Sequence, residues 1–218
     1  MKLETIIFDM DGTLLDSLDG LLHSTNAALE ACGYPRRSYE EVRAFVGNGV
    51  GKLIERALPG GLENPDYERC LAAFKEDYQT AMIEGTRPYP GILELLDSLN
   101  AEGYRLAVVS NKIDSAVKEL SAHFFGGRLP VAIGEREHVA RKPAPDSVFA
   151  ALEELGMPRE TAAYVGDSEV DLETARRAGL SCFSVDWGNR SDAQLLAAGA
   201  TSISRTAGEL LDKIRAAE

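Results

Sequence analysis

A short apolar run that ends in two acids is the feature of this sequence that most restricts its fold. Residues 5–8 read TIIF, a β-branched and aromatic run typical of a buried strand. Asp9 and Asp11 follow at once, and Gly12 lets the chain turn sharply. Two carboxylates in one tight loop repel each other and favour a compensating cation, for which Mg²⁺ is suited because it prefers oxygen ligands. A simple Asp-Gly turn would look the same locally, so partners elsewhere in the chain must decide.

Length and charge exclude several classes of partner. The chain has 218 residues, enough for one domain or for a core domain that carries a smaller insertion. Lys and Arg number 23 against 35 Asp and Glu, which gives a net charge of −12. Binding to nucleic acids or to anionic membranes generally needs a broad basic face, which this balance argues against. We therefore expect neither a nucleic acid nor a membrane as a partner.

Targeting signals and cysteine spacing indicate a reducing compartment. No apolar run approaches the roughly 18 residues of a membrane-spanning helix, and residues 1–4 lead into the first strand without a signal-peptide pattern. Cys32, Cys70 and Cys182 are scattered and lack CxxC spacing, so we expect reduced thiols and neither a disulfide framework nor a zinc site. The sequence thus predicts a cytoplasmic protein.

Hydrophobic periodicity divides the chain into two parts. Residues 16–85 show only helical patterns, whereas helix and strand patterns alternate from residue 86 onward. Repeated βα units with right-handed crossovers produce a parallel sheet that helices cover on both faces. The sequence therefore predicts an α/β fold, with a parallel-sheet core built from residues 1–15 and 86–218. Residues 16–85 would form a small all-helical domain inserted after the first strand.

Polar side chains follow the predicted strands at the points where a ligand site is expected. In parallel sheets, ligands bind outside the carboxyl ends of the strands. Ser110 and Asn111 follow one predicted strand, Asp167 and Asp171 follow another, and Lys142 lies between them in a proline-stiffened loop. Each residue alone has an ordinary explanation as a helix cap or a solvated side chain. Their joint occurrence with the two opening acids favours a shared site.

The motifs, taken in this order, resemble those of the haloacid dehalogenase-like phosphatase superfamily. The resemblance covers essentially the whole chain and implies a Rossmann-like core with a small helical cap inserted after the first motif. Within the superfamily the chain is most similar to the phosphoglycolate phosphatase group. The stretches that carry this similarity are FDMDGTLLDS (8–17), FVGNGVGKLIERAL (45–58), YPGILELLDSL (89–99), VVSNK (108–112) and RKPAPD (141–146).

The resemblance implies a role for each residue of the opening loop. Asp9 would be the nucleophile that attacks phosphorus and forms an aspartyl-phosphate. Asp11 would be the general acid that protonates the leaving group and then the base that activates water. Gly12 and Thr13 would support this loop.

The resemblance also implies a cofactor, Mg²⁺, and a phosphate site. The metal would be held by Asp9, the backbone carbonyl of Asp11, Asp167 and Asp171. The transferring oxygens would be bound by Ser110, Asn111 and Lys142.

Substrate choice is expected to come from the inserted helices, because the core would bind only the phosphoryl group. The candidates for contacting the leaving group are Gly47, Asn48, Gly49 and Lys52, although the same residues fit an ordinary glycine turn between two helices. The expected partner is a small phosphorylated metabolite, and the protein is expected to be a monomer or a homodimer.

The function expected from this resemblance is Mg²⁺-dependent hydrolysis of a small phosphomonoester, most similar to that of the phosphoglycolate phosphatases. A β-phosphoglucomutase-like phosphomutase, a pyrophosphatase or a nucleotidase on the same core stays open. Hydrolytic dehalogenases fit less well, because they lack the acid at position 11. A receiver-type signalling domain, which accepts phosphate without being an enzyme, is disfavoured because it has no helical insertion after its first strand.

Overall fold

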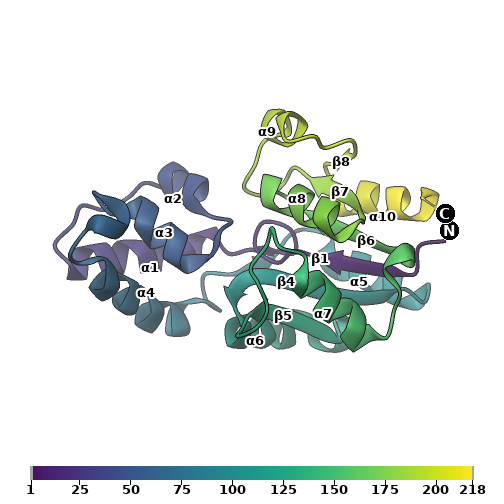
Figure 1. The fold of residues 1–218 in the computed structure, drawn as a ribbon, viewed down its shortest axis with the longest axis horizontal. Coiled ribbons are helices and arrows are strands. Elements are labelled where there is room, and N and C mark those ends of the chain that lie inside the picture. Colours follow the sequence, from purple (N-terminus) through teal and green to yellow (C-terminus); the bar gives the residue numbers. More distant parts are fainter. Residues whose placement is uncertain (1, 218) are drawn as a thin grey trace. The chain divides into compact units, whose positions relative to one another are not determined.

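The computed structural model describes residues 2–217 and shows a six-stranded parallel sheet flanked by helices (Figure 1). Its strand order is β5-β4-β1-β6-β7-β8, and every neighbouring pair is parallel. The predicted α/β fold is confirmed. The strands are β1 (Thr5–Phe8), β4 (Arg105–Ile113), β5 (Val131–Glu135), β6 (Ala162–Gly166), β7 (Ser181–Val185) and β8 (Ile203–Ser204).

The helices of this sheet unit pack on apolar faces of the strands. Its helices are α5 (Ile92–Ala101), α6 (Asp114–Phe125), α7 (Asp146–Leu155), α8 (Glu169–Ala178), α9 (Asp192–Ala197) and α10 (Ala207–Ala216), with single 3₁₀ turns at Gly126–Arg128 and Arg159–Thr161. All four residues of β1 are buried, as expected for a central strand that is covered on both faces. Ile7 pairs with Ala107 on one side and with Tyr164 on the other, and these residues share one core cluster with α7 and α8.

Strand β4 is longer than the apolar pattern predicted. The pattern ended at Val109, whereas the strand continues to Ile113 through Ser110, Asn111 and Lys112, with a register irregularity between Val109 and Ile113. The backbone N–H of Lys112 donates to the hydroxyl oxygen of Ser110 at 3.2 Å, so a local hydrogen bond supports the irregular end. Polar residues can extend a strand in this way without contributing to its apolar periodicity.

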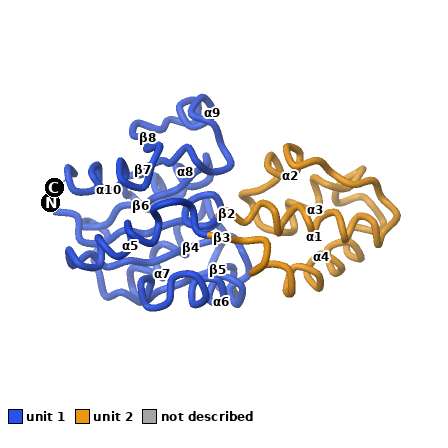
Figure 2. The backbone as a smooth tube through the Cα atoms, turned by 180° about the vertical axis from the view of Figure 1, so that it is seen from behind, with its two compact units in different colours: residues 1–15, 88–218 blue, residues 16–87 orange. Residues whose placement is uncertain are grey.

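Residues 16–87 form a second compact unit, while residues 1–15 and 88–218 form the sheet unit (Figure 2). The second boundary follows Arg87, whereas the sequence pattern placed it after residue 85. A two-stranded ribbon of β2 (Leu15–Asp16) and β3 (Arg87–Pro88) spans both chain crossings. This ribbon was not predicted, because strands of two residues are too short to show an alternating pattern.

The second unit consists of helices that pack on one another. Its elements are α1 (Leu18–Ala31), α2 (Tyr39–Phe45), α3 (Gly49–Ala57), α4 (Tyr67–Ala81) and a 3₁₀ turn at Gly61–Glu63. Helix α1 contacts α4 most extensively, and Phe74 and Tyr78 of α4 stack at 5.3 Å between ring centroids. The N–H of Gly20 in α1 donates to the carbonyl of Gly85 at 3.1 Å, so the chain leaving the unit lies directly against the helix that enters it.

Two exclusions made from the sequence bear on the described residues. Among residues 2–217, no helix has both the length and the apolar character needed to cross a membrane. None of the three cysteines forms a disulfide, and burial raises the pKa of the Cys70 thiol to about 12. That thiol is therefore neutral and poorly nucleophilic near pH 7.

The close approach of Gly20 and Gly85 predicts a stability effect. A Cβ atom at position 85 would clash with the Cα and N atoms of Gly20. We expect Gly85→Ala to lower the free energy of unfolding by about 1–3 kcal/mol, measured by urea denaturation. Gly127→Ala is the matched control, because a Cβ atom there meets nothing within 4 Å. Equal stability of the two variants would contradict this account.

Candidate active site

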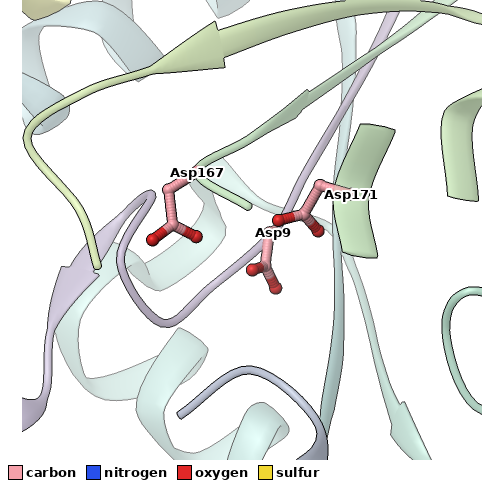
Figure 3. Close-up of side chains that lie close together, drawn as sticks. All are labelled: Asp9, Asp167 and Asp171. Carbon is pink, nitrogen blue, oxygen red and sulfur yellow. The ribbon is translucent and has the colours of Figure 1, made fainter. Parts of the chain in front are cut away.

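Three carboxylates meet at the carboxyl ends of two neighbouring strands (Figure 3). Asp9 follows β1 and Asp167 follows β6, while Asp171 lies in the first turn of α8. The N–H of Asp9 donates to the carbonyl of Val165 at 2.8 Å, which fixes the end of β1 beside β6. One oxygen of each carboxylate lies within 4.8 Å of the others, and all three side chains are buried. A buried cluster of oxygen donors of this kind fits a hard divalent cation such as Mg²⁺.

Asp171 is held by four hydrogen bonds from the protein. Its Oδ2 accepts from the N–H of Ser168 at 3.1 Å and from the Ser168 hydroxyl at 2.6 Å. Its Oδ1 accepts from the Lys142 ammonium at 2.8 Å and from the Tyr164 hydroxyl at 3.2 Å. Because a carboxylate has about four acceptor positions, these donors occupy all of them. In this arrangement Asp171 orients its neighbours, and Asp9 and Asp167 are the acids better placed to offer oxygens to a cation.

Lys142 lies at the centre of the buried charges. Its ammonium is 2.7 Å from Asp9 Oδ1 and 2.8 Å from Asp171 Oδ1, and the side chain is only 3% exposed. Burial alone would lower the pKa of this lysine, but the two carboxylates outweigh it and raise the pKa well above its usual value. Lys142 is therefore a permanent cation that links the acid after β1 to the acid on α8.

The ionised forms of Asp9 and Asp167 are disfavoured by their surroundings, and a cation would stabilise them. Burial, and then the charge of Asp171, raise the pKa of Asp9 well above its usual value, although Lys142 opposes the shift. Burial and Asp171 likewise raise the pKa of Asp167 to about 7, against the opposing hydrogen bond from the Asn189 N–H. A divalent cation stabilises the ionised form of its ligands and so reverses such shifts. The donor set and its electrostatics thus both fit Mg²⁺.

Ser110 and Asn111 lie near the end of β4, the strand that pairs with β1. The side-chain amide of Asn111 donates to the carbonyl of Lys142 at 3.0 Å and accepts from the Lys142 N–H at 2.8 Å. This reciprocal pair ties the end of β4 to the loop that carries the buried lysine. The hydroxyl oxygen of Ser110 is buried beside it and accepts from the N–H of Lys112. The role of Ser110 and Asn111 in phosphate binding stays a prediction.

Asp11 has a cationic partner that sequence analysis did not assign to it. The Lys112 ammonium is 3.2 Å from Asp11 Oδ1, and the lysine side chain is only 3% exposed. Gly12 makes the turn after Asp11 with a φ of +90°, a value that side chains rarely adopt, and its N–H donates to the carbonyl of Leu15 at 2.9 Å. The loop therefore presents its second acid against a buried ammonium at the end of the neighbouring strand β4.

The segment after β7 is a part of the site that sequence analysis missed. The Trp187 indole N–H donates to the carbonyl of Thr13 at 3.0 Å, and the N–H of Asn189 donates to Asp167 Oδ2 at 2.6 Å. A Cβ atom at Gly188 would clash with the carbonyl oxygen of Gly12 and with the Asp167 carboxylate. Applying the strand-end rule to β7, whose apolar run leads directly into Asp-Trp-Gly-Asn, would have found this segment.

The four candidate specificity residues lie in the helical unit. Gly47 and Asn48 connect α2 to α3, Gly49 begins α3, and Lys52 pairs with Glu55 in the same helix at 2.6 Å. Their contact with a leaving group stays a prediction.

The fold and the site together define a class of enzyme. The site lies at the carboxyl ends of the strands. It contains an acid after the first strand, a second acid two residues later, a buried lysine and two acids after a third strand. A helical unit is inserted after the first strand. The chain belongs to the haloacid dehalogenase-like hydrolases, whose family model matches residues 6–185.

Individual relatives place it more narrowly. It is 32% identical to a phosphoglycolate phosphatase of Aquifex aeolicus over 85% of this chain and 86% of that protein. It is 33% identical to phosphoglycolate phosphatase 1 of Pseudomonas aeruginosa over 84% of this chain and 69% of that protein. The predicted resemblance to this group is confirmed, and the chain is an enzyme.

Solved structures have a similar fold over nearly the whole chain. A crystal structure from Lactobacillus delbrueckii, provisionally assigned as a phosphoglycolate phosphatase, matches with a TM-score of 0.94 and 36% identity, over 98% of this chain and 99% of that one. CbbY from Rhodobacter sphaeroides, solved with phosphate, matches with a TM-score of 0.76 and 28% identity, over 95% and 96% of the two chains.

The packing of Gly188 predicts a sensitive position in the site. We expect Gly188→Ala to displace Asp167 and the loop of Gly12, and so to lower hydrolase activity by about 100-fold, because small misplacements of reacting groups are costly. Trp187 is the only tryptophan, so its fluorescence reports the same displacement. The control is Gly208→Ala in α10, where a Cβ atom has room. Unchanged activity and emission in Gly188→Ala would refute this packing argument.

Proposed function

We propose that this protein hydrolyses a small phosphomonoester with Mg²⁺ through an aspartyl-phosphate on Asp9, and that 2-phosphoglycolate is its substrate. The observation that carries the proposal is the arrangement around Asp9. A carboxylate oxygen of Asp9 lies 2.7 Å from the buried Lys142 ammonium, and Asp9 shares a cluster of ligand oxygens within 4.8 Å of one another with two further acids. Two residues on, Asp11 pairs with the Lys112 ammonium. The family and its phosphatase relatives support the same reaction.

In the first step, a carboxylate oxygen of Asp9 forms a bond to phosphorus as the bond from phosphorus to the leaving oxygen breaks. Protonated Asp11 gives its proton to that oxygen, so the leaving oxygen departs as a hydroxyl group. The Lys142 ammonium, which pairs with Asp9 in the resting protein, is close enough to offset the negative charge of the transferring oxygens. Ser110, at the buried end of β4, would donate its hydroxyl to one of them.

In the second step, the aspartyl-phosphate is hydrolysed. Ionised Asp11 takes a proton from a water molecule, whose oxygen bonds to phosphorus while the bond to Asp9 breaks. The products are inorganic phosphate and the restored carboxylate, so the two steps together consume one water. Lys112, which is 3.2 Å from Asp11, would hold this carboxylate in place between its two roles.

Mg²⁺ would be held by Asp9, the backbone carbonyl of Asp11 and Asp167, with Asp171 behind them. When bound, it would supply positive charge that lets an anionic nucleophile approach an anionic phosphate. The N–H of Asn189 fixes one oxygen of Asp167, so the orientation of that ligand is set by the protein itself.

Glycolate is the leaving group that the charges favour. The relatives with which the chain aligns over most of its length are phosphoglycolate phosphatases. Asp11 must contact the leaving oxygen to protonate it, and the Lys112 ammonium is one hydrogen bond from Asp11. A short leaving group with its own carboxylate would bring that negative charge next to this cation. A neutral alcohol would gain nothing from it.

The nucleophile and the metal are tested together. We expect Asp9→Asn to reduce phosphate release from 2-phosphoglycolate to background, because the amide cannot form the acyl phosphate. EDTA should abolish the activity of the unaltered protein, and added Mg²⁺ should restore it. Asp146→Asn, a change in the first turn of α7, is the matched control. Full activity of Asp9→Asn, or with EDTA present, would exclude the mechanism.

The role of Lys112 is tested by comparing leaving groups. We expect Lys112→Met to lower kcat/KM for 2-phosphoglycolate at least about tenfold more than for p-nitrophenyl phosphate, since only the first substrate offers a carboxylate to the ammonium. Lys118→Met is the control, because that lysine is exposed and pairs with Asp114 on α6. Equal losses for both substrates would show that Lys112 supports Asp11 alone.

A substrate screen decides between this proposal and the related activities. Purified protein should release phosphate faster from 2-phosphoglycolate than from sugar phosphates, nucleotides or pyrophosphate. A nucleotide or pyrophosphate preference would replace the proposed substrate, and isomerisation of a sugar phosphate faster than its hydrolysis would make the protein a phosphomutase.

A further inference from the structure

Tyr164 places a hydroxyl group directly beneath the acid cluster. The residue is the third of five in β6 and is fully buried. Its ring belongs to the apolar cluster that the sheet forms with α7 and α8, where it packs with residues such as Ile7, Ala107 and Ala175. A phenylalanine would fill this space equally well. The hydroxyl group therefore requires an explanation that apolar packing does not provide.

The hydroxyl group lies between two charged groups of the site. It accepts from the Lys142 ammonium at 3.0 Å and donates to Asp171 Oδ1 at 3.2 Å. A phenol has one O–H donor and acceptor lone pairs on the same oxygen, so the group can donate and accept at the same time.

The hydroxyl group completes the coordination of the lysine. An ammonium group has three N–H donors. Those of Lys142 have three acceptors, which are Asp9 at 2.7 Å, Asp171 at 2.8 Å and Tyr164 at 3.0 Å. Without the phenol, one donor of a buried cation would lose its partner, and the ammonium group would shift toward the two carboxylates.

We propose that Tyr164 is a positioning residue that holds the Lys142 ammonium group between Asp9 and Asp171. The inference rests on the proposed function, in which Asp9 loses its negative charge as it bonds to phosphorus. At that moment the carboxylate releases the lysine, and the transferring oxygens need the cation at a fixed place. Tyr164 and Asp171 keep it there, because neither changes charge during the reaction. The phenol acts through Lys142 and does not touch the substrate.

The kinetic test uses Tyr164→Phe in the full-length protein with Mg²⁺. We expect kcat to fall at least about tenfold, the effect typical of losing a supporting contact at such a site, while KM stays within about twofold. The thermal unfolding midpoint and circular dichroism monitor the fold. Tyr104→Phe, another buried tyrosine of the sheet unit, is the matched control and should retain kcat. A kcat within twofold of the unaltered protein, or a change in KM alone, would overturn the proposal.

A second measurement does not depend on turnover. In protein labelled with ¹⁵N at the lysine Nζ atoms, an ammonium group with three protein acceptors exchanges its protons slowly and gives an observable signal. We expect one such protected signal, absent from Lys142→Met, in the unaltered protein, and its loss or broadening in Tyr164→Phe. No protected signal in the unaltered protein, or an identical signal in Tyr164→Phe, would overturn the proposal.

The two measurements separate this inference from the proposed function. If the protein hydrolyses no phosphoester, the proposed function fails while the Lys142 signal still tests the contact. If hydrolysis proceeds and the signal is unprotected, the role of Tyr164 fails alone.

Discussion

The burial of several carboxylates at the carboxyl ends of two neighbouring strands is the constraint on which the rest of this structure depends. Asp9, Asp167 and Asp171 are almost completely removed from water, and isolated buried charges are costly. One ammonium, that of Lys142, contacts two of them, which leaves the cluster with more negative than positive charge. Such a site is stable only if protons or a cation supply the difference, and the cluster therefore fits a divalent cation.

The surrounding elements act mainly by holding this cluster in place. The Asn111 amide hydrogen-bonds to the backbone of Lys142, and the Ser168 hydroxyl hydrogen-bonds to Asp171. The loop after β7 uses backbone and indole N–H groups, which hold Asp167 and the Gly12 turn without adding charge. Neutral donors are the groups that can orient a carboxylate without competing with a metal for it. These supporting groups are neutral because the site already holds an excess of buried charge.

The sequence predicted the parts of the site that obey a positional rule. A buried run ending in Asp9, and another ending before Asp167, specify acids at neighbouring strand ends. The remaining parts escaped for physical reasons. Tyr164 lies inside an apolar run, and because its ring fits the apolar pattern of a buried strand, the pattern does not reveal a role for its hydroxyl group. The contact of Lys112 with Asp11 depends on the irregular end of β4, and the contact of Trp187 with Thr13 joins segments far apart in the chain, so neither leaves a local signal.

The proposed reaction would use residues of the sheet unit for every chemical step. In the proposed mechanism, the sheet unit would supply the nucleophile, the proton-transfer acid, the oxygen ligands for a metal and the lysine for the transferring oxygens. It also contains Lys112, a second buried cation, whose ammonium is 3.2 Å from Asp11 Oδ1. If Asp11 protonates the leaving group as proposed, a charge on that group would lie near the Lys112 ammonium. We therefore propose that the sheet unit selects the leaving group by charge, which would leave the residues around Gly49 and Lys52 to select by size and shape.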